Sequence, residues 1–335
     1  MRQLPAPNNR NILVTGASSG IGYEAALGML RNGHKLILPC RNESTSKCLF
    51  KRLEDKSEYK SDLSEMIFTP IVDLSDLRDI EDFAKQLLAR DKSIDTLILN
   101  AGLQYTGSKS IRWSSQGFEL TFAVNHLAHQ YLTESISSLL CNSRSPRVVI
   151  TASEVHNPES PGGRIGKPAG LGEMLGIRRG KGFSMVDGIS NFDADKAYKD
   201  TKLCNILFGR ELYRRLNLMG FPMPVIAWAP GLVIPRTNKG FFRYSRQFNE
   251  LGQRLFSLVA RDFLRITESP EKAGELLFKL ATEPEYNEVG FSYFSNRILS
   301  PGRRSFDRSE ISNEANQNNK AELLWEYTKE LYNLA

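Results

Sequence analysis

Several features that would place this chain of 335 residues in a specialised class are absent from it. No apolar run approaches the roughly 18 residues that a membrane-spanning helix needs. The cysteines lack the spacing of metal ligands and are expected to be free thiols: Cys40, Cys48, Cys141 and Cys204. The first residues lead at once into an apolar strand and leave no room for a signal peptide. These absences predict a cytoplasmic protein.

The charge pattern excludes a further class. No basic stripe interleaved with aromatic residues suggests a nucleic-acid groove, so nucleic acid is not an expected partner. The formal net charge of +6 at pH 7 is a mild bias, which suits an anionic cofactor, an acidic substrate or an acidic membrane surface. The hydrophobic content of 41% is ample for a core.

Short β-branched runs alternate along the chain with longer amphipathic segments. The runs predict strands at residues 11–15, 35–39, 66–72, 95–99, 147–151 and 224–228. The amphipathic segments predict helices at residues 22–32, 77–89, 119–140 and 195–216. Because strands that alternate with helices form βαβ units, we predict an α/β fold: a Rossmann-like, doubly wound parallel sheet with helices on both faces. Residues 1–335 are interpreted as one domain.

Two stretches interrupt this alternation. A Gly/Pro-rich insert covers about residues 157–191, and a basic segment with interleaved phenylalanines covers about 233–266. The second stretch is either a solvated helix packed on the domain or, as we favour, a lid over a large apolar substrate. As a lid it would also contact an anionic membrane surface peripherally. A last helix is expected at about 321–334, and the sequence leaves the oligomeric state open.

The run Thr15-Gly-Ala-Ser-Ser-Gly-Ile-Gly22 follows a predicted strand and opens a helix. Gly16 suits a tight turn, Gly20 allows the close approach of a pyrophosphate, and Gly22 permits close helix packing. The start of the helix offers amide hydrogens and a positive dipole end to phosphates. The run therefore predicts a dinucleotide site, and the alternative is a glycine-rich turn without a ligand. The other residues expected to contact the cofactor here are Ser18, Ser19 and Ile21.

The second predicted strand ends at Pro39-Cys-Arg-Asn42, where an NAD site usually has an acidic residue about twenty positions beyond the glycines. Arg41 stands there instead. A guanidinium suits a 2′-phosphate, so we predict NADPH as the cofactor, with Arg41 and Asn42 beside it. The alternative is a solvated surface arginine. Further cofactor contacts are expected after the third and fourth strands, at Asp73, Leu74, Asn100, Ala101 and Gly102.

Tyr198 and Lys202 lie four residues apart in the run Lys196-Ala-Tyr-Lys-Asp-Thr-Lys-Leu-Cys-Asn205. On a helix this spacing places a phenol and an ammonium on one face. A nearby cation favours phenolate, so the pKa of Tyr198 is expected to be lowered towards the working pH. Such a tyrosine can give or take a proton beside a hydride donor.

With these residues, nearly the whole chain resembles the short-chain dehydrogenase/reductase family. The further motifs that carry the resemblance are Asn125 in the long predicted helix, Ser153 after the fifth strand and Pro230-Gly231 after the sixth. The resemblance implies that Tyr198 is the acid/base, that Lys202 lowers its pKa and holds the ribose, and that Ser153 hydrogen-bonds the reacting group. It also implies that Asn125 supports a water relay and that Pro230, Gly231 and Val233 contact the cofactor.

Within that family, the chain looks most like the light-dependent protochlorophyllide reductases. The resemblance rests on the insert, on Met185-Val-Asp-Gly188, on the run Lys196–Asn205, on Arg210-Glu-Leu-Tyr-Arg-Arg215 and on Glu271-Lys-Ala-Gly274. It implies that NADPH gives a hydride to one carbon of a ring double bond in a porphyrin-like pigment and that Tyr198 gives the proton to the neighbouring carbon. The pigment's own excited state would drive the step, in a photosynthetic bacterium and near its photosynthetic membrane.

The chain departs from those reductases at the pigment site. Leu232 follows the Pro-Gly turn, where they normally have a cysteine, and a leucine can neither donate a proton nor act as a ligand. One alternative is therefore a light-independent carbonyl reductase acting on a retinoid- or steroid-like substrate, since Lys202–Leu212 also resembles retinol dehydrogenases. Another is a non-catalytic pigment-binding protein, which would have no need of a proton donor.

Some other residues have two interpretations. Tyr105 is expected to face the substrate mouth or to be a surface tyrosine. Cys204 resembles a position near the pigment, although a small buried apolar role is favoured. His126 and His129 lie three residues apart on a helix without a third ligand in sight, so core histidines are favoured over a metal site.

Overall fold

The structure, a computed structural model, describes residues 9–57, 63–233, 267–300 and 303–333. Its strands form one eight-stranded sheet in the order β3-β2-β1-β4-β5-β6-β7-β8. Neighbouring strands are parallel except β7 and β8, which are antiparallel. The bounds are β1 Asn11–Val14, β2 Lys35–Ile37, β3 Ile67–Phe68, β4 Thr96–Leu99, β5 Arg147–Thr151, β6 Pro224–Ala229, β7 Gly290–Ser300 and β8 Arg303–Arg308.

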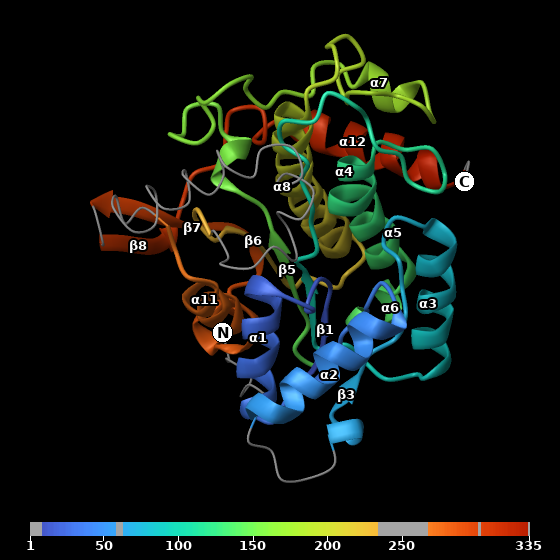
Figure 1. Cartoon of the computed structure of the whole chain (residues 1–335), viewed down its shortest axis with the longest axis vertical. Helices are drawn as coiled ribbons and strands as arrows, with labels where there is room; N and C mark the ends of the chain where they lie inside the picture. Colours follow the sequence, from blue (N-terminus) through green and yellow to red (C-terminus); the bar gives the residue numbers. More distant parts are fainter. Residues whose placement is uncertain (1–8, 58–62, 234–266, 301–302, 334–335) are drawn as a thin grey trace.

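Helices cover both faces of this sheet (Figure 1). The central strands β4, β5 and β6 are buried along their whole length, as expected for parallel strands between two helical layers. One apolar cluster joins the sheet to the helices α1 (Gly20–Arg31), α2 (Glu43–Ser57) and α11 (Pro270–Thr282). The other cluster joins it to α3 (Leu77–Ala89), α5 (Ala128–Ser135), α8 (Ala194–Leu218) and α12 (Asn318–Asn333). The predicted fold class is confirmed.

The helix predicted over residues 119–140 is not continuous, and this part of the prediction is wrong. A short helix α4 (Leu120–Phe122) leads into a π turn (Ala123–Leu127), then α5, and then α6 (Ser137–Cys141). Glu119 starts the segment by accepting the amides of Thr121 and Phe122. The widened π turn contains Asn125, and such turns occur frequently at functional sites.

Other element boundaries also differ from the predicted ones, because the local sequence pattern does not show which strands pair with one another. The strand predicted over residues 66–72 is reduced to Ile67–Phe68 plus one isolated bridge between Cys40 and Ile71. The helix α2 was not predicted, and its buried residues are only Leu49, Leu53 and Ser57, which make a thin apolar stripe. The elements α11, β7 and β8 were also not predicted. The final helix α12 spans Asn318–Asn333 where 321–334 was expected.

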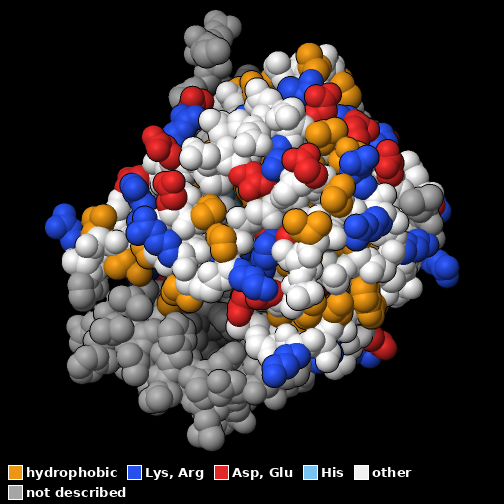
Figure 2. All heavy atoms as spheres, turned by 90° about the horizontal axis from the view of Figure 1, so that it is seen from above, with side chains coloured by type: hydrophobic (Ala, Val, Ile, Leu, Met, Phe, Trp, Pro, Cys, Tyr) orange, Lys and Arg blue, Asp and Glu red, His pale blue; other side chains and the backbone are white. Residues whose placement is uncertain are grey.

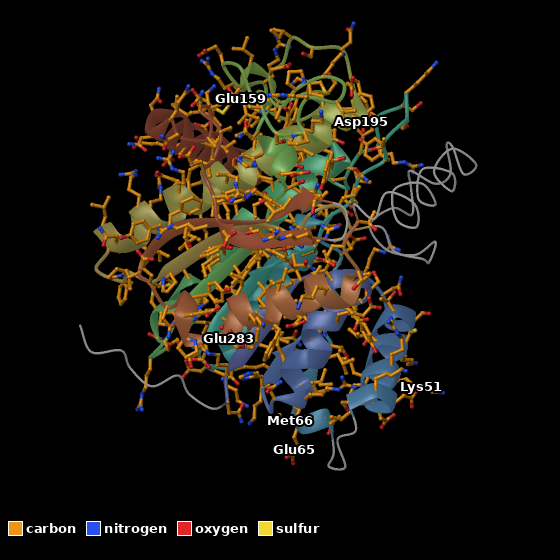
Figure 3. The ribbon with its side chains drawn as sticks, turned by 90° about the vertical axis from the view of Figure 1, so that its left-hand side faces the viewer. Lys51, Glu65, Met66, Glu159, Asp195 and Glu283 are labelled. Carbon is orange, nitrogen blue, oxygen red and sulfur yellow. The ribbon has the colours of Figure 1, made fainter. Side chains whose placement is uncertain are left out.

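The carboxyl ends of the parallel strands meet at one end of the molecule, where ligands of open α/β sheets bind. Figure 3 shows Glu159, which follows β5, and Asp195, in the first turn of α8, at this end. Met66, which precedes β3, lies at the opposite end. The insert contains the short helix α7 (Leu175–Arg178) and lies near the start of α8. The predicted lid, at about 233–266, falls outside the described residues from residue 234 onward.

Candidate active site

The glycine loop between β1 and α1 leaves no room for side chains at two positions. Gly16 has a φ of +73°, and a Cβ there would lie 2.7 Å from the Cα of Ala101. A Cβ on Gly22 would lie 2.4 Å from the carbonyl oxygen of Gly16. A Cβ on Gly20, with φ +57°, would meet nothing within 4 Å, so the backbone is open at that point. The loop is thus packed on its inner side and accessible on its outer side.

The first turn of α1 is available for a phosphate. Ser19 is its N-cap residue, but its side chain makes no capping hydrogen bond, and no acidic residue lies in the first turn. Amides left free at a helix start bind anions, and the positive dipole end adds to this attraction. The residues present therefore fit the pyrophosphate of a dinucleotide.

Thr15 holds the glycine loop against the turn that follows β4. Its Oγ1 accepts the amides of Asn100 at 2.9 Å and Ala101 at 3.0 Å. The Nδ2 of Asn100 donates back to the Thr15 carbonyl at 3.1 Å. The Oδ1 of Asn100 accepts the Thr151 hydroxyl at 3.2 Å, so the ends of β1, β4 and β5 are fixed to one another. The structure thus brings together the predicted loop at Gly16 and the predicted turn at Asn100.

Gly22→Ala is expected to weaken dinucleotide binding strongly and to lower stability by about 1–3 kcal/mol, because the added methyl group has no space in this packed loop. Gly28→Ala in the same helix is the matched control. Its Cβ would meet the Phe278 ring at 3.6 Å, an ordinary contact. An alanine there should stabilise the helix by about 0.5–1 kcal/mol. Thermal unfolding and cofactor titration of both variants test this prediction. Equal changes in stability and in cofactor affinity for Gly22→Ala and Gly28→Ala would contradict it.

The residues predicted beside the adenosine part lie at the same edge. Arg41 follows β2 and is exposed, so its guanidinium is accessible to a ligand. The Oδ1 of Asn42 accepts the amide and the hydroxyl of Thr45, which caps α2. The Oδ1 of Asp73 accepts the Ser75 amide and hydroxyl. Asn42 and Asp73 thus stabilise the local structure through these hydrogen bonds. Their contacts with a cofactor, and that of Leu74, stay predictions.

Tyr198 and Lys202 share one face of α8, as predicted. The Nζ of Lys202 lies 5.6 Å from the centroid of the Tyr198 ring and donates to the Thr151 carbonyl at 2.9 Å. Lys202 is buried, and burial lowers its pKa to about 7. The expectation that the pKa of Tyr198 is lowered is wrong for this state of the chain. Burial raises the pKa of Tyr198, and the Ser153 hydroxyl offsets this only in part, so the phenol keeps its proton at neutral pH.

Ser153 and Asn125 flank this pair. Ser153 follows β5 and caps a short 3₁₀ turn (Glu154–His156), and its hydroxyl interacts with Tyr198. Asn125 is fully buried in the π turn. Its Oδ1 accepts the Leu103 amide at 2.8 Å, and its Nδ2 donates to the Leu103 carbonyl and to the Thr201 hydroxyl on α8.

The turn after β6 approaches the same edge of the sheet. Gly231 has a φ of +81°, and a Cβ there would lie 2.9 Å from the Asn296 carbonyl oxygen. The Nδ2 of Asn296 donates to the Pro230 carbonyl at 3.1 Å. Leu232 accepts the Glu268 amide through its carbonyl oxygen at 2.8 Å, and its side chain is partly exposed.

The comparisons with known proteins agree with this geometry. The profile of the short chain dehydrogenase family matches residues 10–164. The WW domain-containing oxidoreductase of Homo sapiens is 30% identical over 325 residues, covering 96% of this chain and 67% of that protein. The chain belongs to the short-chain dehydrogenase/reductase family. Its resemblance to that family, stated from the motifs, is therefore confirmed.

Two further similarities concern the whole length of this short-chain dehydrogenase/reductase. The chloroplastic protochlorophyllide reductase B of Hordeum vulgare is 28% identical over 333 residues, covering 97% of this chain and 79% of that protein. Among solved structures, an uncharacterized protein from Mycobacterium paratuberculosis matches with a TM-score of 0.67 at 23% identity, covering 97% of this chain and 93% of that chain. At this identity the second similarity supports the fold alone.

Two residues of this short-chain dehydrogenase/reductase that were considered for substrate contact, Tyr105 and Cys204, are both buried. Tyr105 is 0% exposed, and its hydroxyl donates to Glu119 while its ring stacks on Phe192. It is therefore neither a surface residue nor placed at a mouth. Cys204 is also 0% exposed and belongs to the apolar core, which confirms the favoured interpretation as a small buried residue and excludes a substrate contact in this conformation.

His126 and His129 are fully buried core residues, as favoured. The Nε2 of His126 lies 3.2 Å from the Thr328 hydroxyl, and the Nε2 of His129 lies 3.0 Å from the Thr15 hydroxyl. Within the described part of the chain, no cluster of three or more potential ligands could hold a metal ion.

Sequence reasoning missed two residues that build the site. Thr151 accepts Lys202 through its carbonyl and the Trp228 indole through its hydroxyl, at 3.0 Å. Its position, two residues before Ser153 at a strand end, was a usable signal. The other is Lys199, next to Tyr198, whose buried ammonium donates to carbonyls of the insert at Gly163, Ile165 and Lys167. Only its place within the quoted run pointed to it.

Proposed function

We propose that this protein is an NADPH-dependent reductase that reduces protochlorophyllide to chlorophyllide in light. The observation that carries the proposal is the attachment of the insert to the helix of Tyr198. Lys199 gathers three insert carbonyls, two of them at 3.1 Å and 3.0 Å from its Nζ. One turn away, the Nζ of Lys196 lies 2.6 Å from Asp200 and 3.1 Å from Asp187 of the insert.

This attachment links the two sequence features that resemble protochlorophyllide reductases. The Oδ1 of Asp200 also accepts the Gly170 amide at 2.9 Å, and Lys196 donates to the Gly170 carbonyl at 2.8 Å. The residues around Tyr198 therefore fix the insert beside the proton donor, where a large substrate would need a wall. The relative from Hordeum vulgare carries the name protochlorophyllide reductase, which supports the same substrate for this chain.

The side chains of the site have separable roles in this reaction. NADPH, when bound against Gly16–Gly22, would supply the hydride. Tyr198 holds its proton at neutral pH and would donate it to the neighbouring carbon, with Ser153 orienting the reacting group. Lys202, Asn125 and the Thr151 carbonyl fix the position of Tyr198 and its helix. The residues proposed to hold the cofactor are Gly16, Ser18, Ser19, Gly20, Ile21, Gly22, Arg41, Asn42, Asp73, Leu74, Asn100, Ala101, Gly102, Tyr198, Lys202, Pro230, Gly231 and Val233.

Arg41→Gln is expected to reduce the preference for NADPH over NADH by about 10–100-fold, because a guanidinium bound to a phosphate contributes roughly 1.5–3 kcal/mol. The measurement is kcat/KM with each cofactor. Lys47→Gln is the control, since Lys47 is an exposed cation on the adjacent α2 that pairs with Glu43. A wild-type preference for NADH, or equal effects of both variants, would contradict the assignment.

A light-independent carbonyl reductase acting on a retinoid- or steroid-like substrate is the second candidate. Leu232 favours it, because this position cannot supply the chemistry of the cysteine usual in protochlorophyllide reductases. A relative at 30% identity, the WW domain-containing oxidoreductase of Homo sapiens, carries a name other than protochlorophyllide reductase, so the comparisons also leave room for a different substrate. A pigment-binding protein without activity is the third candidate, and the assembled Asn125, Ser153, Tyr198 and Lys202 argue against it.

The deciding experiment is an absorbance assay of the purified protein with NADPH and protochlorophyllide, in darkness and under illumination. A red-shifted product formed only in light is expected. Pigment binding without turnover would favour the binding protein. The absence of pigment binding would overturn the proposal in favour of the carbonyl reductase, which a panel of apolar aldehydes and ketones would then test.

We place this activity in the cytoplasm of a photosynthetic bacterium, peripheral to its photosynthetic membrane. No helix of the described ranges is both long and apolar enough to cross a membrane. Figure 2 looks onto the end that carries the insert, where basic, acidic and hydrophobic side chains are intermixed. The net charge of +6 supports contact with anionic lipid.

A further inference from the structure

His129 joins two parts of the site that come from distant segments of the chain. It lies on α5 with 1% of its surface exposed. Its Nε2 is 3.0 Å from the Oγ1 of Thr15, at the start of the glycine loop. Its Nδ1 is 3.2 Å from the carbonyl oxygen of Asn125, in the π turn. One imidazole therefore contacts both the nucleotide loop and the segment that carries a catalytic residue.

The partners determine where the proton of this imidazole sits. A carbonyl oxygen can only accept, so Nδ1 carries the hydrogen that is donated to Asn125. Burial, and secondarily the charge of Lys202, lower the pKa of His129 to about 3, so the ring is neutral and Nε2 is an acceptor. The Thr15 hydroxyl therefore donates to Nε2. Its other acceptor, the Ile98 carbonyl, lies farther away at 3.3 Å and already accepts the Thr15 amide at 3.0 Å.

Each end of this bridge reaches further into the site. The Thr15 oxygen that donates to His129 also accepts the amides of Asn100 and Ala101, which form the turn beneath the proposed cofactor. At the other end, the Asn125 side chain donates to the Thr201 hydroxyl on α8, between Tyr198 and Lys202 in sequence. A displacement of the imidazole would thus move the glycine loop at one end and the contact between Asn125 and α8 at the other.

We propose that His129 is a positioning residue that couples the nucleotide loop to the proton-donating side of the site, through Thr15 and Asn125 respectively. The inference rests on the proposed NADPH-dependent reduction. His126 provides the contrast, because it is equally buried but its Nε2 bonds Thr328 of α12, away from the nucleotide loop.

Two substitutions separate the ends of the bridge. In His129→Asn the shorter amide can replace Nδ1 and keep the Asn125 contact, whereas the contact with Thr15 is lost. In His129→Gln the longer amide can replace Nε2 and keep the Thr15 contact, whereas the contact with Asn125 is lost. Loss of one neutral hydrogen bond corresponds to roughly a 5–10-fold effect. We expect His129→Asn to raise the Kd of NADPH by about that factor with little change in kcat, and His129→Gln to lower kcat with little change in Kd.

Three measurements test the bridge. NADPH fluorescence titration gives the Kd, illuminated turnover of protochlorophyllide gives kcat, and hydrogen exchange of the ligand-free protein reports the amides of Asn100 and Ala101. Faster exchange of these amides in His129→Asn, but not in His129→Gln or in the control His126→Gln, is the expected result. Equal exchange rates in all three variants would overturn the coupling. So would a weakening of NADPH binding and a fall in kcat that both variants share in proportion to their loss of thermal stability.

The exchange measurement needs neither cofactor nor substrate, which separates the two proposals. Absence of NADPH binding by the wild-type protein, together with the expected exchange pattern, would overturn the proposed function and leave the structural bridge intact. Normal NADPH binding with an unchanged exchange pattern would overturn the bridge alone.

Discussion

Tyr198→Phe is expected to lower turnover by about 10²–10⁴-fold while leaving the Kd of NADPH nearly unchanged, because only the proton donor is removed. The phenol is the group of the site that holds a transferable proton next to Ser153, and burial keeps it protonated at neutral pH by raising its pKa. The ring itself remains, so the packing over Lys202 at 5.6 Å is kept. Single-turnover kinetics under a light pulse, with cofactor titration in darkness, give both quantities.

The matched control is Tyr213→Phe, on the same helix α8 and partly buried, but about four turns from the site. It should retain full turnover. If Tyr198→Phe also retained it, the proton would have to come from solvent or from another group, and the assignment of Tyr198 as the acid would be wrong.

Lys202→Met is expected to weaken NADPH binding by about 10–100-fold and to lower turnover as well, since a charged hydrogen-bond donor contributes roughly 1.5–3 kcal/mol. The free energy of unfolding at pH 7 should instead increase. Burial lowers the pKa of Lys202 from 10.5 to about 7, so between these pH values the unfolded state binds more protons than the folded state. The stability contribution of this group therefore rises as the pH increases from about 7 to 10.5, and the charge is most costly at and below neutral pH.

Methionine removes that cost, so Lys202→Met should be more stable than the wild type at pH 7, by an amount that shrinks as the pH approaches 10. The Thr151 carbonyl keeps a donor in the Asn205 amide at 3.4 Å.

Lys196→Met on the same helix should lower stability instead. It leaves the buried carboxylates of Asp187 and Asp200 without their cation, which costs about 3–5 kcal/mol. Denaturant unfolding across this pH range tests both, and a destabilised Lys202→Met at pH 7 would contradict the argument.

The sequence alone was sufficient for the fold class and for the order of the first six strands. Buried strands such as β4, β5 and β6 are continuous apolar runs, and the turns after them carry recognisable residues, so their order could be predicted along with the glycine loop and the pair Tyr198 and Lys202. Local pattern was also sufficient for the fold class, because alternating periods of two and 3.6 residues reflect burial by neighbours in the sheet and its helices.

The tertiary structure decided what depends on distant contacts. The π turn at Asn125 forms where its side chain meets Leu103 and Thr201, and these lie 22 and 76 positions away. Tyr105 is buried because Glu119 and Phe192 enclose it. The protonation of Tyr198 and Lys202 follows from desolvation rather than from their spacing, since burial is the largest cause of the pKa shift of each group. Residue types and spacing thus determine which chemistry is available, and packing determines the protonation state of the groups that carry it out.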